Sequence, residues 1–292
     1  MLTNLTAMGI ESEVVAQSRC RLMTGYRALD AARINSLLGE YADVFTVETV
    51  GQTGSTNDDL VARARTGGPG GLVRVAEVQT AGRGRRQRSW YSAPGGALTF
   101  SLLWVFSGGS GALSGLPLAV GVSLIRSLQA FNLQSVQLKW PNDLLWQQRK
   151  LGGVLIETCN TGDNEVSAVI GIGLNLRLSR SVAERIDQPA SDLEAAGLGV
   201  ERNELLARLL IDLKGVLELF SREGFAPLRP EWERLHAYHD KMVRLEMGGE
   251  KQVEGRVVGV DEYGALVLET ASGKRVFHAG ELSLRVVGTA RR

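Results

Sequence analysis

The sequence predicts an α+β protein in which a mixed α/β domain precedes a small C-terminal β-barrel. The length of 292 residues suggests about two domains. Patterns typical of helices and of strands are interleaved over most of the chain, whereas residues 242–287 carry only short alternating strands separated by turns. Such a run favours a small barrel. We expect the boundary near His239, with one domain over residues 29–239 and the other over residues 240–292.

The first domain contains five stretches whose apolar residues recur at helical spacing. They span residues 28–42, 55–65, 118–131, 203–223 and 226–238. Ser55 or Thr56 can cap the second helix, and Pro117 suits the first turn of the third. Gly224 follows the fourth helix, where a C-terminal cap belongs.

Six apolar or alternating runs predict strands in the same domain. They span residues 44–50, 73–79, 98–105, 136–140, 151–157 and 166–176. The fourth run is followed by Pro141-Asn142-Asp143, which we interpret as a turn. In the second domain we expect turns at Gly248-Gly249, at residues 261–264 and at Ser272-Gly273.

Composition excludes several classes of protein. The net charge of +1 provides no overall field that would attract nucleic acid or a membrane. Cys20 and Cys159 are far apart, so neither a disulfide framework nor a structural zinc site is expected. The first ten residues do not resemble a signal peptide, and no apolar run approaches the roughly 18 residues that cross a bilayer. We therefore expect a cytoplasmic protein without a membrane partner.

Four arginines stand among the six residues from Arg83 to Arg88. Gly82 and Gly84 allow a tight bend that exposes backbone N–H groups. Such a loop can surround an anion and place guanidinium groups on its oxygens. A solvated basic loop and an RNA-binding patch are alternatives that the residues alone leave open. Gln87 stands where the GxGxxG motif of dinucleotide-binding proteins needs its third glycine, so that motif is absent.

Four further segments carry amide, hydroxyl or lysine side chains, and three of the four also contain glycine. They are Gly54-Ser55-Thr56-Asn57, Lys139-Trp140-Pro141-Asn142-Asp143, Arg149-Lys150-Leu151-Gly152-Gly153 and Gly171-Ile172-Gly173-Leu174-Asn175. Each can be structural, as a helix cap, a lysine that reaches solvent or a closely packed strand end. Taken alone, the first two segments favour the structural interpretation over contact with a polar ligand, the third leaves both open, and the fourth indicates a closely packed strand end.

Other catalytic motifs are missing from the sequence. It contains neither GxxxxGK[ST] nor GxSxG. Its three histidines, His236, His239 and His278, all come late in the chain, so a histidine triad or zinc site is not expected. A site rich in arginine, lysine and amides suits the stabilisation of charge in a phosphate reaction better than a proton relay.

Taken in order, the segments GSTN, EVQTAGRGRR, KWPND, RKLGGVLIE and GIGLN resemble those of the bacterial biotin–protein ligases. The similarity runs from about Asp30 to Arg285. It implies a mixed-sheet biotin/lipoate-ligase-like catalytic domain with a C-terminal SH3-like barrel. It also implies the reaction: the biotin carboxylate attacks the α-phosphate of ATP, with Mg²⁺, and releases pyrophosphate. A lysine of a biotin carboxyl carrier domain then displaces AMP from the biotinyl-adenylate.

The resemblance implies a role for each residue that matches a family motif. The ureido ring of biotin is held by Ser55, Thr56, Asn57 and Gln79, and the loop that closes over it contains Arg83, Gly84 and Arg85. The nucleotide is contacted by Arg85, Trp90, Lys139, Asn142, Asp143 and Asn175, and from the barrel by Glu281 and Arg285. Lys150 lies between the biotin carboxylate and the α-phosphate. The predicted catalytic residues are Lys150, Arg85 and Lys139, because two reacting anions need positive charge between them. No metal ligand is identified.

The sequence departs from the family pattern at two places. Gln87 replaces a glycine often found in the loop, which should stiffen it. Residues 1–28 resemble only the end of the winged helix-turn-helix that bifunctional ligase–repressors carry, so specific DNA binding is not expected, and a homodimer stays open. The competing hypotheses are a lipoate–protein ligase or octanoyltransferase, whose RRxSGGG-type loop is absent, an RNA-binding protein, and a repressor of biotin genes.

Overall fold

The computed structural model describes residues 12–16, 19–22, 26–107, 109–162, 164–247, 252–278 and 282–286. The helices are α2 (Ala31–Leu38), α3 (Thr56–Arg65), α4 (Leu116–Ala130), α5 (Arg180–Ala183), α6 (Arg202–Glu223) and α7 (Arg229–Leu235). The strands of the first domain are β3 (Thr46–Thr53), β4 (Leu72–Gln79), β5 (Ala97–Ser107), β6 (Val136–Lys139), β7 (Asp143–Trp146), β8 (Arg149–Gly162) and β9 (Glu165–Asn175). Within these ranges, no helix combines the length and the apolar content that a membrane span requires.

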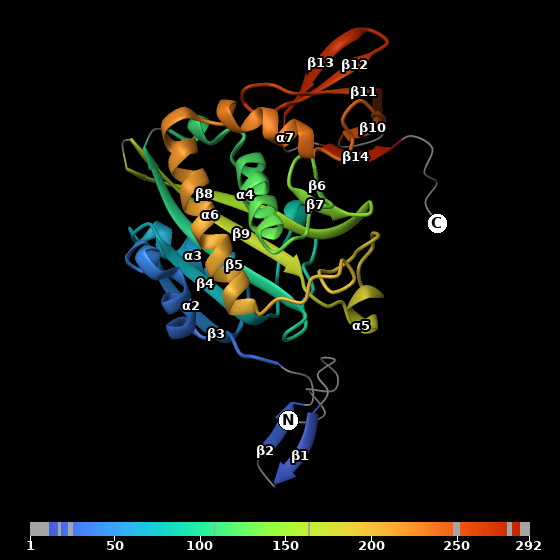
Figure 1. The fold of residues 1–292 in the computed structure, drawn as a ribbon. Helices are drawn as coiled ribbons and strands as arrows, with labels where there is room; N and C mark the ends of the chain where they lie inside the picture. Colours follow the sequence, from blue (N-terminus) through green and yellow to red (C-terminus); the bar gives the residue numbers. More distant parts are fainter. Residues whose placement is uncertain are drawn as a thin grey trace.

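The first domain is built on a mixed seven-stranded sheet with the order β3-β4-β5-β9-β8-β7-β6 (Figure 1). Only β3 and β4 run parallel, and α3 forms the crossover between them. The other neighbouring strands pair antiparallel. The longest ladder joins β5 to β9 at the centre of the sheet, where almost every side chain is buried.

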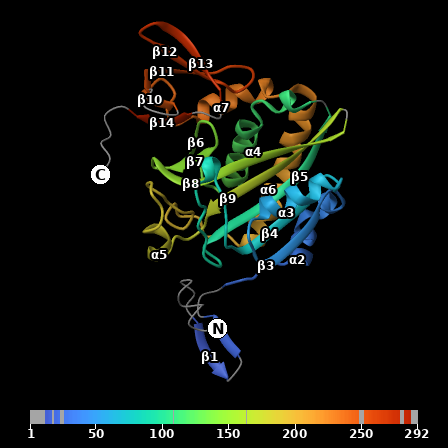
Figure 2. The same cartoon turned by 180° about the vertical axis from the view of Figure 1, so that it is seen from behind.

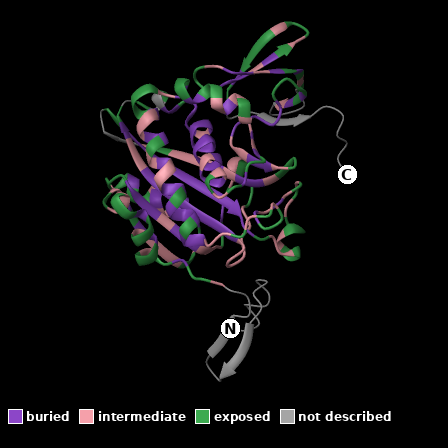
Figure 3. Cartoon of the chain, in the orientation of Figure 1, coloured by how far each residue is buried: buried purple, intermediate pink, exposed green. Residues whose placement is uncertain are grey.

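Helices cover both faces of this sheet. Helices α2, α4 and α6 lie on the face seen in Figure 1, and α3 lies on the opposite face, seen in Figure 2. Alternate residues of β9 serve the two sides: Ile170 and Leu174 belong to the large core under α4 and α6, whereas Val169 packs with Leu60 of α3. Figure 3 shows the resulting buried interior between the helical layers. The α3 face carries less apolar packing, which leaves space there for a cavity.

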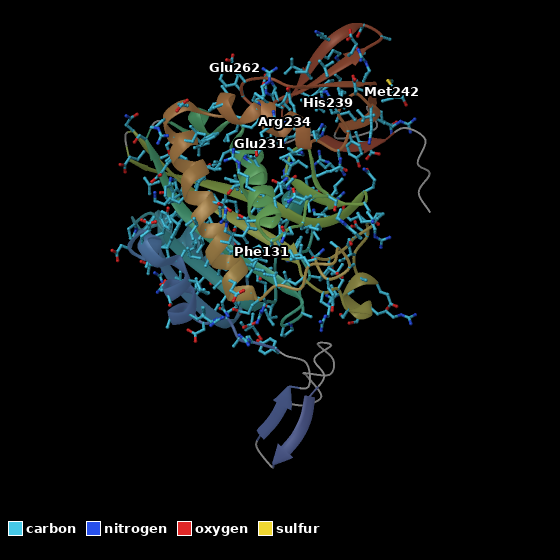
Figure 4. The ribbon with its side chains drawn as sticks, viewed as in Figure 1. Phe131, Glu231, Arg234, His239, Met242 and Glu262 are labelled. Atoms are coloured by element: carbon cyan, nitrogen blue, oxygen red, sulfur yellow. The ribbon has the colours of Figure 1, made fainter. Side chains whose placement is uncertain are left out.

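The second domain is a five-stranded antiparallel sheet with the order β13-β12-β11-β10-β14. Its strands are β10 (Met242–Met247), β11 (Gln252–Val260), β12 (Leu266–Thr270), β13 (Gly273–Phe277) and β14 (Leu282–Val286). It adjoins α7, which carries Glu231 and Arg234 in Figure 4. Trp140 fixes the contact, because it is 1% exposed and its Nε1 donates to the Gly264 carbonyl at 3.0 Å. The two domains therefore meet directly behind the Lys139–Asp143 turn.

Most expected elements are confirmed, and two helices are shorter than expected. The first helix begins at Ala31, because the Asp30 side chain accepts from two backbone N–H groups there, and it ends at Gly39, whose φ is 57°. The stretch 226–238 divides into a 3-10 turn and α7, which ends where His236 takes extended backbone. Ser55 caps α3, as expected.

Two elements were not expected from the sequence, the strand β7 and the short helix α5. The turn from β7 to β8 contains Gln147 and Gln148 at φ values of 47° and 63°. Hairpins usually place asparagine or glycine in such left-handed positions, so the sequence carried no hairpin signal here. Strands β1 (Ser12–Ala16) and β2 (Arg19–Leu22) pair antiparallel. Residues 1–11, 17–18 and 23–25 of the expected winged-helix remnant, and the Gly248-Gly249 turn, lie outside the described residues.

Candidate active site

A cavity of about 370 Å³ opens on the α3 face of the large sheet. It is lined by the N-terminal end of α3, by β4, β5, β8 and β9, and by the loop that follows β4. Thirteen of the fifteen residues predicted for the site line it: Ser55, Thr56, Asn57, Gln79, Arg83, Gly84, Arg85, Trp90, Lys139, Asn142, Asp143, Lys150 and Asn175. The motifs are up to 120 residues apart in the chain, and the fold brings them to one place.

One end of the cavity is polar but uncharged. The Thr56 backbone N–H and hydroxyl both donate to Gln79 Oε1, at 2.7 and 3.0 Å. Because the amide oxygen of Gln79 is engaged in this way, its Nε2 is the group left to donate to a ligand. Ser101, which sequence analysis missed, lies 2.8 Å from the Thr56 hydroxyl and donates to Asn57 Oδ1 at 2.6 Å. Ser55, Thr56 and Asn57 are each 3% exposed, so this hydrogen-bonded set is desolvated.

Glycines of β9 make room for this polar end. A Cβ added to Gly171 would overlap Asn57, and one added to Gly173 would lie 2.6 Å from two ring carbons of Trp90. The Trp90 ring therefore packs closely against the strand at Gly173 and lines the cavity. Its Nε1 is buried and has no acceptor among the described residues. The pattern of Gly171 and Gly173 reflects close packing by functional side chains.

The arginine loop has a defined conformation. The Trp90 N–H donates to the Gly82 carbonyl at 2.8 Å, and the Gly84 N–H donates to the Arg88 carbonyl at 2.7 Å. Arg86 and Gln87 both take left-handed backbone, with φ values of 56° and 59°. Glycine adopts this conformation without strain, which gives a physical reason for the glycine that the family resemblance led us to expect at the position of Gln87.

The arginines of the loop have different surroundings. Arg83 pairs with Asp58 and also with Glu157, at 3.2 Å, so its charge is already balanced by protein carboxylates. Burial alone would lower the pKa of Arg83, but the two carboxylates outweigh it and raise the pKa. Arg85 instead donates to Asn142 Oδ1 at 3.2 Å. Burial, and then repulsion by Arg86, lower the pKa of Arg85. Of these two arginines, Arg83 is already paired with carboxylates, so Arg85 would gain more from a bound anion.

The other end of the cavity is charged. Lys150 Nζ lies 2.7 Å from Asp143 Oδ1, and the two side chains are 20% and 15% exposed. The backbone of Lys150 is fixed on both sides, since its N–H donates to Pro189 and its carbonyl accepts from Ser191. Lys139 and Asp143 face each other across the β6–β7 hairpin. The Asn142 amide donates to the Val154 carbonyl at 2.8 Å, which holds the turn against β8.

The segment after α5 also lines the cavity, and sequence analysis missed it. Its lining residues are Arg185, Ile186, Asp187, Gln188 and Ala190. The Arg185 guanidinium lies over the ring of Tyr91, 4.1 Å from its centre. Asn175 anchors this segment, because its Nδ2 donates to the Ser191 carbonyl at 2.9 Å. This segment contains neither a pair of glycines nor a cluster of charges. The one sequence signal for its place at the cavity is that it follows the GIGLN motif, which ends at Asn175.

The two remaining predicted site residues cannot be placed at the cavity. Glu281 lies outside the described residues, and Arg285 is described only as part of the β14 backbone, which pairs with β10. A described contact between the barrel and a residue that lines the cavity is the hydrogen bond from Trp140 Nε1 to the Gly264 carbonyl at 3.0 Å. The Trp140 backbone N–H lies 3.5 Å from Nε2 of His236, at the end of α7 in the first domain. Burial lowers the pKa of His236 to about 3, so this ring is a neutral acceptor.

A protein-borne metal centre does not form among the described residues. No three histidine, cysteine, aspartate or glutamate side chains converge there. The acidic residues that line the cavity are Asp143 and Asp187. Mg²⁺ is usually bound by one or two carboxylates together with phosphate oxygens of a substrate. Asp143 and Asp187 therefore fit an Mg²⁺ ion that is bound together with a nucleotide.

Comparison with known proteins agrees with this geometry. Residues 52–175 match the Biotin/lipoate A/B protein ligase family, and residues 238–285 match the Biotin protein ligase C terminal domain. A bifunctional ligase/repressor BirA of Salmonella typhimurium is 35% identical over 97% of this chain and 87% of its own length. A biotin–[acetyl-CoA-carboxylase] ligase of Mycobacterium tuberculosis is 32% identical, covering 85% and 92%.

Among solved structures, the biotin protein ligase from Aquifex aeolicus in complex with biotin and ATP superposes with a TM-score of 0.71 at 31% identity. The match covers 82% of this chain and 99% of the Aquifex chain. The matches of both domains, the curated relatives and the solved structure all indicate one family, and the chain belongs to the biotin protein ligase family.

Proposed function

We propose that this chain activates biotin with ATP in the cavity under α3 and transfers the biotinyl group to a lysine of a carrier protein. The observation that carries the proposal is the division of one cavity into an uncharged, hydrogen-bonded end and a cationic end. A ligand with a polar head and an anionic tail fits this division, and a ligase of Aquifex aeolicus similar to this chain binds biotin and ATP.

The uncharged end favours biotin over lipoate, which the matched family also includes. Ser55 and Thr56 supply donors and acceptors that are taken out of water, and the half-buried Gln79 is hydrogen-bonded to Thr56. A ureido ring can satisfy them, whereas a dithiolane or an alkyl chain would leave them unpaired. Unpaired polar groups in a site built for hydrogen bonding can cost about 10⁴-fold or more in discrimination.

The cationic end suits the chemistry of adenylation. A carboxylate oxygen of biotin attacks the α-phosphorus, the bond to the bridging oxygen of pyrophosphate breaks, and both reactants carry negative charge. We assign Lys150, Arg85 and Lys139 to the stabilisation of that charge. Lys150 must then leave Asp143, at 2.7 Å, for the reacting anions. ATP would bring Mg²⁺ into the cavity. Asp143, which lies 2.7 Å from Lys150, is the carboxylate that would hold this cation.

Transfer requires a different geometry. The amine of the acceptor lysine attacks the acyl carbon, AMP leaves, and a proton is lost to solvent. The mixed anhydride hydrolyses unless water is kept away from it, and the arginine loop over the cavity can exclude water. We propose a biotin carboxyl carrier domain as the acceptor, in keeping with the acetyl-CoA-carboxylase specified in the name of the Mycobacterium tuberculosis relative.

The test is the release of pyrophosphate from ATP and Mg²⁺ with biotin, lipoate or octanoate, followed by transfer of label to a carrier domain. Biotin alone should support both steps. Turnover with lipoate or octanoate, while biotin is inert, would replace this proposal by the lipoate-ligase reading.

A further inference from the structure

Arg83 is connected to two elements beyond its own loop. Its Nη2 contacts Asp58 in the first turn of α3 and lies 3.2 Å from Glu157 Oε2 on β8. The side chains of Arg83, Asp58 and Glu157 are 37%, 55% and 30% exposed. Among the described residues, these ion pairs are the side-chain contacts of Arg83, so they join the start of the loop to the body of the domain.

Glu157 also contacts the uncharged end of the cavity. Its Oε2 accepts from Asn57 Nδ2 at 2.8 Å, and the same nitrogen lies 3.4 Å from the Leu155 carbonyl. Asn57 Oδ1 accepts from Ser101 at 2.6 Å. Both N–H donors of the Asn57 amide are therefore used inside the protein. Asn57 consequently orients Ser101, and Glu157 orients Asn57.

We propose that Asp58 and Glu157 are positioning residues that hold the loop closed through Arg83, and that Glu157 couples loop closure to the orientation of Asn57. We call these three side chains, Arg83, Asp58 and Glu157, the latch. This inference rests on the proposed function, since it assumes that the loop closes over biotin and its adenylate. It gives Arg83 a role distinct from that of Arg85, because its charge holds the loop and is not available to the reacting phosphate.

The size of the effect follows from the exposure of these groups. Exposed ion pairs contribute about 0.2–1 kcal/mol, which corresponds to roughly 1.4- to 5-fold in an equilibrium constant. Loss of one partner should therefore speed release of biotinyl-adenylate by up to about fivefold, and salt should screen the difference. Removal of the acceptor for a buried amide costs more, on the order of 5- to 100-fold.

Three variants separate the two roles of Glu157. Asp58→Asn weakens only the ion pair. Glu157→Gln removes the charge but keeps an amide oxygen that can accept from Asn57. Glu157→Ala removes both. The control is Glu254→Gln, which breaks a similarly exposed pair with Arg244 on the second domain, where the side chains are 50% and 45% exposed. Thermal unfolding of each variant without ligand identifies any general loss of stability.

The measurement is the dissociation rate of preformed biotinyl-adenylate at low and high salt, with the KM for biotin and the single-turnover adenylation rate. We expect Asp58→Asn and Glu157→Gln to raise the dissociation rate two- to fivefold at low salt and to lose that difference at high salt. The KM should rise in parallel, while the adenylation rate at saturating biotin changes by less than twofold. Glu157→Ala should release adenylate faster than Glu157→Gln at every salt concentration.

Dissociation rates of Asp58→Asn and Glu157→Gln equal to that of Glu254→Gln would overturn the latch. Equal rates for Glu157→Ala and Glu157→Gln would overturn the coupling to Asn57. Either result leaves the proposed function intact as long as the unsubstituted chain releases pyrophosphate with biotin. If that chain forms no biotinyl-adenylate, the proposed function fails instead.

Discussion

Replacement of Gly173 by alanine tests whether the wall of the cavity is as tight as the geometry requires. The added Cβ would lie 2.6 Å from two ring carbons of Trp90, and the backbone of Trp90 is held by a 2.8 Å hydrogen bond from its N–H to the Gly82 carbonyl. Ordinary contact begins near 3.4 Å, so the ring or the strand must shift by about 0.8 Å. A displacement of about 1 Å in a positioned site can cost about 10²-fold. We therefore expect Gly173→Ala to lower kcat/KM for biotin-dependent pyrophosphate release by roughly 10²-fold.

Gly215→Ala is the matched control, because the same methyl group is added at an exposed position of α6 with no atom within 4 Å. It should leave kcat/KM unchanged and raise stability by about 0.5–1 kcal/mol, since alanine favours helix over glycine. Pyrophosphate release and thermal unfolding are measured on both variants. A Gly173→Ala enzyme within threefold of the parent in kcat/KM would refute the packing argument.

Three further predictions concern the charged side chains and the domain junction. Lys150→Ala should reduce single-turnover adenylation by roughly 10²-fold or more, as for the loss of one donor to a developing anion; near-normal rates would reject the assignment. Arg85→Gly should let biotinyl-adenylate escape, so that lysines of a bystander protein become biotinylated; labelling confined to the carrier would contradict it. The pKa of His236, buried and held at about 3 in the folded protein, implies that the unfolded chain binds one more proton between about pH 6.5 and 3. Stability is then lost as the pH falls, by about 1.4 kcal/mol per pH unit for this group. Urea unfolding at pH 6.5 and 5 should show a loss roughly 2 kcal/mol larger for the parent than for His236→Asn, and equal losses would contradict the shift.

The sequence predicted a helix or strand correctly where its local residue pattern can arise from only one kind of structure. Apolar spacing located α6, and the short polar residues before Asn57 located the start of α3, because helix ends need side-chain caps. It failed at β7, where Gln147 and Gln148 adopt left-handed backbone without the usual glycine or asparagine. Turn conformations of that kind depend on the flanking strands and cannot be read from local composition.

The sequence predicted which segments would lie together at the cavity, but not how their side chains contact one another. The motifs identified which segments meet, since Ser55 and Lys150 line the same cavity. They could not show that Arg83 is balanced by Asp58, because a surface carboxylate near a helix start is most simply explained by the helix dipole. Ser101 was missed for a related reason: a serine within an apolar strand acquires meaning only when the opposite side chains are known.

The small second domain contacts the Lys139–Asp143 turn, which lines the cavity. Trp140 stands between Lys139 and the Asn142-Asp143 pair, and both of its N–H groups point toward the junction with the second domain. One donates to Gly264 at 3.0 Å and the other lies 3.5 Å from the neutral ring of His236. A tryptophan buried in this way fixes the backbone on which Lys139 and Asp143 stand, and Asp143 in turn holds Lys150. Through Trp140, the β domain can therefore influence the cationic end of the cavity.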